Sequence, residues 1–245
     1  MNSFFDTLAL DDFKLSQSNM TLLNDRTIIV KKWNWDFDLA LKFQRMCLTL
    51  LDNAPHTRIL ICCSHPRVFT NGRGLQKPKK GETLSLIEFD KTQAKSLPFP
   101  FYQIERGGGL TFHHPGQMII YPIVRLNPAH LSLSSMINDL FDFAIETLKE
   151  WGLSDVNHEN KLLGLWHKNQ KLASMGIAIE KLTTFHGMAL NFHQDLEMKR
   201  ALQILNPCGL NAETYTSVEE LIPLNQRSLD QFAENFLRRF AHAWK

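Results

Sequence analysis

Residues 162–192 read LLGLWHKNQKLASMGIAIEKLTTFHGMALNF, and their pattern gives the strongest indication of the fold. The apolar residues 162–166 are followed by the polar turn His167-Lys168-Asn169-Gln170 and then by a second mostly apolar stretch, residues 171–182. Two such stretches around a short polar turn predict a β-hairpin. Residues 185–192 are again apolar and add a third strand, so we expect neighbouring strands of one sheet.

Outside this stretch, hydrophobic spacing predicts both strands and helices. We expect strands at residues 58–63, 101–105 and 117–126, and helices at residues 37–51, 134–151 and 228–244. Gly152 and Ser228 stand where a C-terminal and an N-terminal helix cap are expected. Residues 71–100 look like a long connection. Because helices and strands do not alternate regularly, we predict an α/β fold of the α+β type, with packed helices on a mixed, largely antiparallel sheet.

Length, charge and composition limit the possible function classes. The 245 residues carry a formal net charge of only +2, and no clustered basic surplus of the kind that grips nucleic acid is seen. No apolar run approaches the roughly 20 residues that span a bilayer. The N-terminus, with three Asp and no Arg up to residue 15, resembles neither a signal nor a transit peptide. We expect a cytoplasmic protein, with residues 1–25 as an N-terminal extension and 26–245 as one catalytic domain.

The four cysteines, Cys47, Cys62, Cys63 and Cys208, show no spacing typical of a metal site or a disulfide framework. Cys208 lies in the turn-forming sequence Asn206-Pro207-Cys208-Gly209, which can present a thiol as a nucleophile. A free thiol titrates near pH ~8.5, so a catalytic cysteine needs a cationic neighbour to be mostly thiolate at neutral pH. The alternative is that Cys208 is a small buried apolar residue.

Lys171 opens the segment Lys171-Leu172-Ala173-Ser174-Met175-Gly176 at the start of the second hairpin strand. If Leu172 points into the core, Lys171 faces the other side of the sheet. Ser174 and Gly176 supply a hydroxyl and bare backbone, which suit a place where substrate approaches. The alternative is an exposed lysine at the end of a strand.

A glycine-rich segment precedes the strand at residues 117–126. It reads Arg106-Gly107-Gly108-Gly109-Leu110-Thr111-Phe112-His113-His114-Pro115-Gly116-Gln117, which matches neither a dinucleotide fingerprint nor a phosphate loop. Glycines between strands let the backbone pass close to a ligand, or they form a plain turn. His113 and His114, with His186 or His193, form a weak metal candidate, because no Asp, Glu or Cys stands beside them at a usual spacing. We therefore expect neither a metal nor a cofactor.

Taken in series, these motifs resemble those of the lipoyl(octanoyl) transferases. The first is Arg106-Gly107-Gly108 with Thr111, His113 and Pro115-Gly116-Gln117, and the second is Lys171-x-Ala-Ser-x-Gly. The third is Phe185-His186-Gly187-Met188-Ala189-Leu190-Asn191 with Asp195-Leu196. The fourth is Asn206-Pro207-Cys208-Gly209. In addition, His65-Pro66-x-Val68-Phe69-Thr70 resembles a stretch that comes earlier in the sequences of this family. The resemblance runs from about residue 58 to 210. His114 departs from it, because a glycine is expected there, and so does the long Asp195–Cys208 spacing.

The resemblance implies a function and a set of site residues. Members of this family move an octanoyl group from acyl carrier protein to a lysine of lipoyl domains, on a fold related to biotin and lipoate ligases. The lipoyl domains belong to 2-oxoacid dehydrogenase complexes and to the glycine cleavage H protein. By resemblance, Cys208 is the nucleophile and Lys171 its partner. The residues expected to bind substrate are Arg106, Gly107, Gly108, Gly109, Leu110, Thr111, Phe112, His113, Ser174, Met175, Gly176, Gly187, Met188 and Ala189.

Elementary chemistry agrees with this hypothesis. A lysine ammonium beside the sulfur favours the thiolate, which attacks the carrier thioester. The acceptor lysine must then lose a proton, which Lys171 can take once it is neutral itself. Three alternatives remain: an ATP-dependent lipoate–protein ligase, a lipoyl-domain amidotransferase, and a non-catalytic module that binds acyl groups or lipoyl domains.

Overall fold

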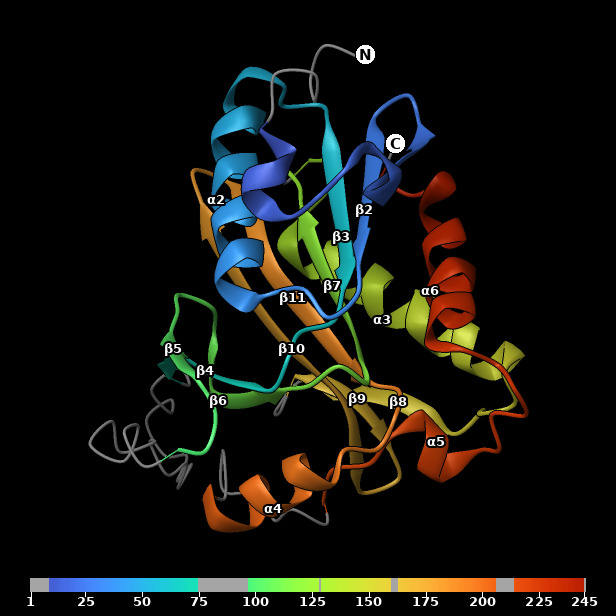
Figure 1. Cartoon of the computed structure of the whole chain (residues 1–245). Helices are drawn as coiled ribbons and strands as arrows, with labels where there is room; N and C mark the ends of the chain where they lie inside the picture. The colour runs from blue at the N-terminus through green and yellow to red at the C-terminus, as the bar shows by residue number, and fades with distance from the viewer. Residues whose placement is uncertain (1–8, 75–96, 128, 160–162, 206–213, 245) are drawn as a thin grey trace, which may run out of the picture.

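The computed structural model describes residues 9–74, 97–127, 129–159, 163–205 and 214–244, and Figure 1 shows their arrangement. The predicted nucleophile Cys208, with its flanking turn, lies outside the described residues. Most of the expected connection at residues 71–100 does too. Its first residues form a strand, so the expectation of a connection was wrong for residues 71–74.

Two sheets are found among the described residues. The large sheet has eight strands, in the spatial order β1 (Met20–Asn24), β2 (Thr27–Lys32), β3 (Arg58–Cys63), β7 (Gln117–Ile123), β11 (Thr183–Asn191), β10 (Gln170–Glu180), β9 (Gly164–His167) and β8 (Val156–Glu159). All neighbours in it are antiparallel except β2 and β3. The small sheet has the order β5 (Phe101–Gln103), β4 (Val68–Gly74) and β6 (Gly108–His113). The predicted mixed, largely antiparallel α/β fold is confirmed.

Helices cover both faces of the large sheet. The main helices are α2 (Phe37–Asn53), α3 (Leu133–Glu150), α4 (Leu196–Leu205) and α6 (Leu229–Arg238), of which α4 packs against the small sheet. Shorter elements are η1 (Leu10–Phe13), η2 (Gln17–Asn19), α5 (Val218–Leu221) and η6 (Arg239–Ala241). Figure 1 shows the sheet between α2 on one side and α3 with α6 on the other. None of the helices in the described ranges combines the length and apolar character that crossing a membrane requires.

The alternation of side chains along the strands creates two cores. On β3, Cys62 packs with the residues of α3 and α6, whereas Cys63 packs with those of α2, as expected for adjacent residues in a strand. On β7, Met118 and Ile120 face the α3 side, and Ile119 and Tyr121 face the α2 side. Full burial of a side chain such as Phe43 stabilises the fold by about 1.5–3 kcal/mol, and each core contains many such residues.

Local signals explain the main helix ends. The Ser228 hydroxyl accepts a hydrogen bond from the Gln231 N–H, and the Gln231 side chain accepts one from Ser228 N–H, which completes a capping box at α6. Gly152 adopts φ +97° after α3, so the predicted left-handed cap is confirmed.

The N-terminal residues that the structure describes pack against the domain. Strand β1 pairs with β2, and Leu10 and Leu15 are buried beside α2. The Trp35 indole N–H donates to the carbonyl of Phe13 at 2.9 Å. The division of the chain at residue 25 stays a prediction, but residues on both sides of it share one sheet.

Candidate active site

A cavity lies between the α2 face of the large sheet and strand β6 of the small sheet. Its empty volume is about 370 Å³, part of which is open to solvent. Of the residues expected to bind substrate, the cavity is lined by Arg106, Thr111, His113, Ser174, Met175, Gly176, Gly187, Met188 and Ala189. These residues come from three separate motifs, so the fold brings together what the sequence separates. That they bind substrate stays a prediction.

Strand β6 explains why the remaining expected residues do not line the cavity. Its alternation turns Thr111 and His113 toward the cavity and Leu110 and Phe112 to the other side, where both pack with Phe69. This second cluster includes Met198 and Ala201 of α4. Leu110 and Phe112 therefore support the cavity wall and connect it to α4. Gly107, Gly108 and Gly109 also lie outside the lining. Gly108 and Gly109 open strand β6 itself, where the sequence suggested an interruption.

Two glycines allow the backbone to pack tightly around the cavity. The chain at Arg106 and Gly107 crosses directly over β10, and Gly107 N–H donates to the Ile177 carbonyl at 3.1 Å. A Cβ on Gly176 would lie 2.9 Å from both Arg106 Cδ and the Gly107 carbonyl oxygen. A Cβ on Gly187 would overlap the Ile120 carbonyl oxygen of the neighbouring strand. Bare backbone at these two positions is therefore a packing requirement.

A chain of buried hydrogen bonds runs through His113. Arg106 Nη2 donates to Thr70 Oγ1 at 2.9 Å, and Thr70 Oγ1 lies 3.3 Å from His113 Nε2. On the other side of the ring, Nδ1 lies 3.1 Å from Gln117 Oε1. The atom that faces the ring is the oxygen, because the Gln117 amide N–H groups donate to the Phe112 carbonyl and to Asn191 Oδ1. His113 therefore carries its proton on Nδ1 and accepts the Thr70 hydroxyl proton at Nε2. Burial lowers the pKa of His113 well below its usual range, so the ring is neutral.

A second buried hydrogen-bonded pair consists of His65 and Tyr121, of which Tyr121 lines the cavity. His65 Nδ1 lies 2.7 Å from the Trp35 carbonyl, which can only accept, so Nδ1 carries the proton. The Tyr121 hydroxyl then donates to Nε2 at 2.8 Å. Burial lowers the pKa of His65 to about 4 and raises that of Tyr121 well above its usual range. Both groups are therefore neutral across physiological pH.

Lys171 lies on the same strand as Ser174 and Gly176, outside the cavity lining. Only 8% of the residue is exposed, and its Nζ lies 5.4 Å from the centre of the Trp166 ring, a cation–π distance. The pairing of β10 with β9 shifts between Lys171 and Ala173, which is the signature of a β-bulge. The alternative of an exposed lysine is excluded.

The described residues on either side of the 206–213 gap contact the site. Thr216 N–H donates to the Lys171 carbonyl at 3.1 Å, and the Asn191 side chain donates to the Thr216 carbonyl at 3.0 Å. Because Asn191 also accepts from Gln117, the hydrogen-bonded chain continues from His113 to the backbone beside Lys171. Before the gap, α4 packs against strand β6 through Met198 and Ala201.

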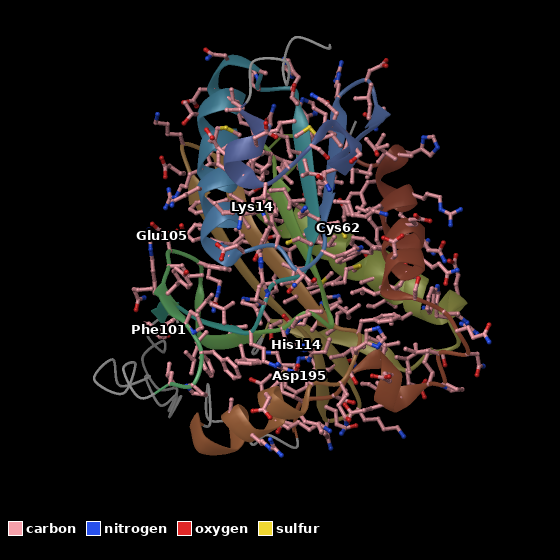
Figure 2. The ribbon with its side chains drawn as sticks, in the orientation of Figure 1. Lys14, Cys62, Phe101, Glu105, His114 and Asp195 are labelled. Carbon is pink, nitrogen blue, oxygen red and sulfur yellow. The ribbon has the colours of Figure 1, made fainter. Side chains whose placement is uncertain are left out.

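His114, the residue that departs from the family pattern, lies near the start of α4. Its Nδ1 accepts from Gly116 N–H at 3.2 Å and lies 3.9 Å from Asp195 Oδ2 (Figure 2). Asp195 caps α4 by accepting from Met198 N–H at 2.8 Å and pairs with Arg67 at 2.9 Å. Burial lowers the pKa of His114 to about 4. The imidazole therefore fills the space between β6 and the helix cap as a neutral ring.

Metal binding by the histidines has no structural support. Within the described residues, no group of three or more His, Cys, Asp and Glu is placed to hold a metal ion. Both nitrogens of His113 are already engaged by Gln117 and Thr70.

The sequence missed several residues that line the cavity, namely Phe37, Ile104, Ile119, Tyr121 and His186. His186 was named as a possible metal ligand and as part of the third motif, but not as a residue that binds substrate. The others come from elements that the sequence treats as core, and only the folded arrangement brings them to the cavity.

Comparison with known proteins agrees with this geometry. A model of the family described as lipoyl protein ligase A/B catalytic domain matches residues 36–241. The chain is 30% identical over 233 residues to an Arabidopsis thaliana protein named octanoyltransferase LIP2p2, chloroplastic, which covers 91% of this chain and 77% of the relative. It is 32% identical to an octanoyltransferase of Syntrophobacter fumaroxidans, with 71% of this chain and 70% of the relative covered.

A crystal structure of lipoate-protein ligase A bound with ATP has the same fold. It superposes with a TM-score of 0.62 at 15% sequence identity, covering 88% of this chain and 83% of the ligase. The expected relation to the lipoate ligase fold is confirmed. With the family match spanning most of the chain, the protein belongs to the lipoyl protein ligase A/B catalytic-domain family.

Proposed function

We propose that the protein transfers an octanoyl group from octanoyl-acyl carrier protein to a lysine of lipoyl domains, the first step of endogenous protein lipoylation. The observation that carries this proposal is the likeness to relatives named octanoyltransferase, at 30–32% identity over 70% or more of both chains. The acceptors are the lipoyl domains of 2-oxoacid dehydrogenase complexes and the glycine cleavage H protein. The protein acts in the cytoplasm.

The cavity suits an acyl chain. Its walls include the apolar residues Phe37, Ile104, Ile119 and Ala189. Three of its polar residues have hydrogen-bond partners behind the cavity wall: Arg106 and His113 bond to Thr70, and Tyr121 bonds to His65. An apolar ligand held by a few fixed polar groups is the usual composition of a small-molecule site.

In the first step, the thiolate of Cys208 attacks the carbonyl carbon of the octanoyl thioester. The bond from Cys208 Sγ to carbon forms, and the bond to the carrier sulfur breaks. The Lys171 ammonium stabilises the attacking thiolate and gives a proton to the departing carrier thiolate, so Lys171 becomes a neutral amine. The carrier leaves as a free thiol, and the octanoyl group remains on Cys208 as a thioester.

In the second step, the amine of the acceptor lysine attacks the same carbonyl carbon. The amide bond forms, the bond to Cys208 breaks, and neutral Lys171 takes the proton that the amine loses. Cys208 returns as a thiolate beside a Lys171 ammonium, which is the starting state. The sequence of steps consumes no ATP.

Reconstituted transfer tests this function. Octanoyl-acyl carrier protein, an unmodified lipoyl domain and the purified protein are mixed without ATP, and the mass of the lipoyl domain is followed. We expect one added octanoyl group, and none on a lipoyl domain whose acceptor lysine is replaced by Arg. Modification only with free octanoate and ATP would identify a ligase instead. Transfer only from an octanoylated lipoyl domain would identify an amidotransferase.

A further inference from the structure

His186 has a backbone conformation that is unusual for its position. It lies inside strand β11, yet its φ is +57°, in the left-handed region. For a residue with a Cβ this conformation is disfavoured and persists only where the surroundings impose it. An outlier of this kind in a buried strand points to a role for the side chain.

The positive φ turns the imidazole of His186 toward the cavity. In a regular strand, His186 would share the α3 face with Met188 and Leu190. Instead its ring packs edge-on against Tyr121, with centroids 6.2 Å apart, and Tyr121 belongs to the α2 face. The His186 N–H donates to Gln44 Oε1 of α2 at 2.8 Å, which fixes the turned backbone.

The imidazole is buried and leaves one nitrogen without a partner. His186 is only 1% exposed, and burial lowers its pKa to about 3, so the ring is neutral. Among the described residues, four buried polar side chains have an atom without a hydrogen-bond partner, and of these only His186 lines the cavity. The cavity is therefore lined by a strained residue whose Nε2 has no hydrogen-bond partner.

Strand register puts His186 at the inner end of the cavity. Ser174 pairs with Ala189, and three steps further Ile177 pairs with His186, a distance of about 10 Å along the strands. Along β10, Lys171 lies three residues from Ser174 in the direction away from Ile177. The reacting end of a bound chain therefore lies at the Lys171 end of the cavity. Beyond Gly176 the groove is closed, because Arg106 and Gly107 cross over β10.

An eight-carbon acyl chain fits this length. At about 1.2 Å per bond, an extended octanoyl group reaches roughly 8 Å from its carbonyl carbon. A chain that starts beside Ser174 therefore ends just before the His186 ring. Additional methylene groups would have to displace the ring or lie against its unpaired nitrogen, and both are unfavourable.

We propose that His186 closes the inner end of the acyl cavity and sets the length of chain that the enzyme accepts. This inference rests on the proposed function, because it assumes that an acyl chain enters from the Lys171 side. His186 acts by position and shape, without touching the reacting atoms.

A competition experiment tests the proposal. Equal amounts of octanoyl-, decanoyl- and dodecanoyl-acyl carrier protein are offered together, and the acylated lipoyl domains are resolved by mass. For His186→Gly, we expect the dodecanoyl-to-octanoyl product ratio to rise at least about tenfold over wild type. Glycine accepts the positive φ without strain, so the backbone conformation of the strand is retained in this variant. His186→Asn, which also tolerates this conformation, should give a smaller rise.

Leu182→Gly is the matched control. Leu182 also has a positive φ, +66°, but lies 53% exposed at the turn between β10 and β11, so its replacement relieves backbone strain away from the cavity. Its product ratio should equal that of wild type. An unchanged ratio in both His186 variants, with octanoyl transfer intact, would overturn the chain-length role alone. No transfer of any chain by folded wild type would overturn the proposed function, and the chain-length role with it.

Discussion

At the scale of single residues, Lys171 has surroundings that suit a catalytic cation. Its side chain is enclosed beside Trp166, and a Cβ added to Gly164 on the neighbouring strand would lie 3.0 Å from Lys171 Cε. Its carbonyl is held by Thr216 N–H. The ammonium group is therefore confined to a small volume. A confined charge is what the proposed Cys208 thiolate requires, because the attraction weakens with distance.

Replacing Lys171 by Met keeps an unbranched side chain that is one atom shorter and removes its charge. We expect the rate of octanoyl transfer to fall by about 10²–10⁴-fold, the usual effect of losing a group that transfers protons. Without the neighbouring cation, the pKa of the Cys208 thiol should rise, which the pH dependence of iodoacetamide alkylation measures. Cys47, Cys62 and Cys63 are buried and burial raises their thiol pKa values, so alkylation of the folded protein reports on Cys208.

Lys168→Met is the control for this prediction, because Lys168 is exposed in the same hairpin. Its transfer rate and alkylation profile should match those of wild type. A Lys171→Met enzyme that keeps its rate within about twofold would exclude Lys171 as the proton carrier.

Some residue-level features could be predicted from the sequence and others could not. Motif resemblance singled out Thr111, His113 and Ser174, and the fold brings them to one cavity. The turned backbone of His186 has no signal in the sequence, because the left-handed conformation is imposed by Gln44 and the neighbouring strands. The burial of Lys171 was likewise hidden, since it depends on Trp166 and on the distant Thr216.

At the scale of elements, close strand pairing depends on the absence of a side chain at Gly187. A methyl group there would overlap the Ile120 carbonyl oxygen, so β7 and β11 would have to separate. We expect Gly187→Ala to lower the free energy of unfolding by about 3 kcal/mol, at the upper end for overpacked positions. Urea denaturation measures the change.

Gly152→Ala provides the comparison. Gly152 has φ +97°, but a Cβ added there would meet nothing within 4 Å, so only backbone strain opposes the substitution and the cost should be about 1 kcal/mol. Equal losses in the two variants would contradict the packing explanation for Gly187.

Strong local patterns predicted the elements that form the large sheet and its helices. The hairpin of β9 and β10, strand β3 and helices α2 and α3 were all expected, because each has a clear hydrophobic period and a turn or cap signal. Strand β6 was missed, since two glycines at its start read as a break. It forms because β4 pairs with it and because its apolar face packs under α4, and both partners are distant in sequence.

At the scale of the whole molecule, buried neutral histidines make stability depend on pH. Burial lowers the pKa of His65 and His114 to about 4 and that of His186 to about 3, against about 6.5 in the unfolded chain. Between pH 6.5 and 4 the unfolded chain therefore binds more protons than the folded protein, so acidification favours unfolding.

The pKa of His113 is also lowered by burial, so four histidines contribute, and we expect the free energy of unfolding to fall below pH 6.5 with a slope of roughly 5 kcal/mol per pH unit near pH 5. Urea denaturation at a series of pH values measures this slope. His186→Gly should reduce the slope by about 1.4 kcal/mol per pH unit, which corresponds to one proton. A flat profile between pH 6.5 and 5 would show that these rings gain protons without unfolding.

The most direct test of the proposed mechanism is the intact mass of the protein after incubation with octanoyl-acyl carrier protein alone. For wild type, we expect a gain of one octanoyl group that hydroxylamine removes, and no gain for Cys208→Ala. That result would establish the thioester on Cys208. A folded wild-type protein that gains no octanoyl group, or a Cys208→Ala variant that still gains one, would contradict a covalent mechanism at this cysteine.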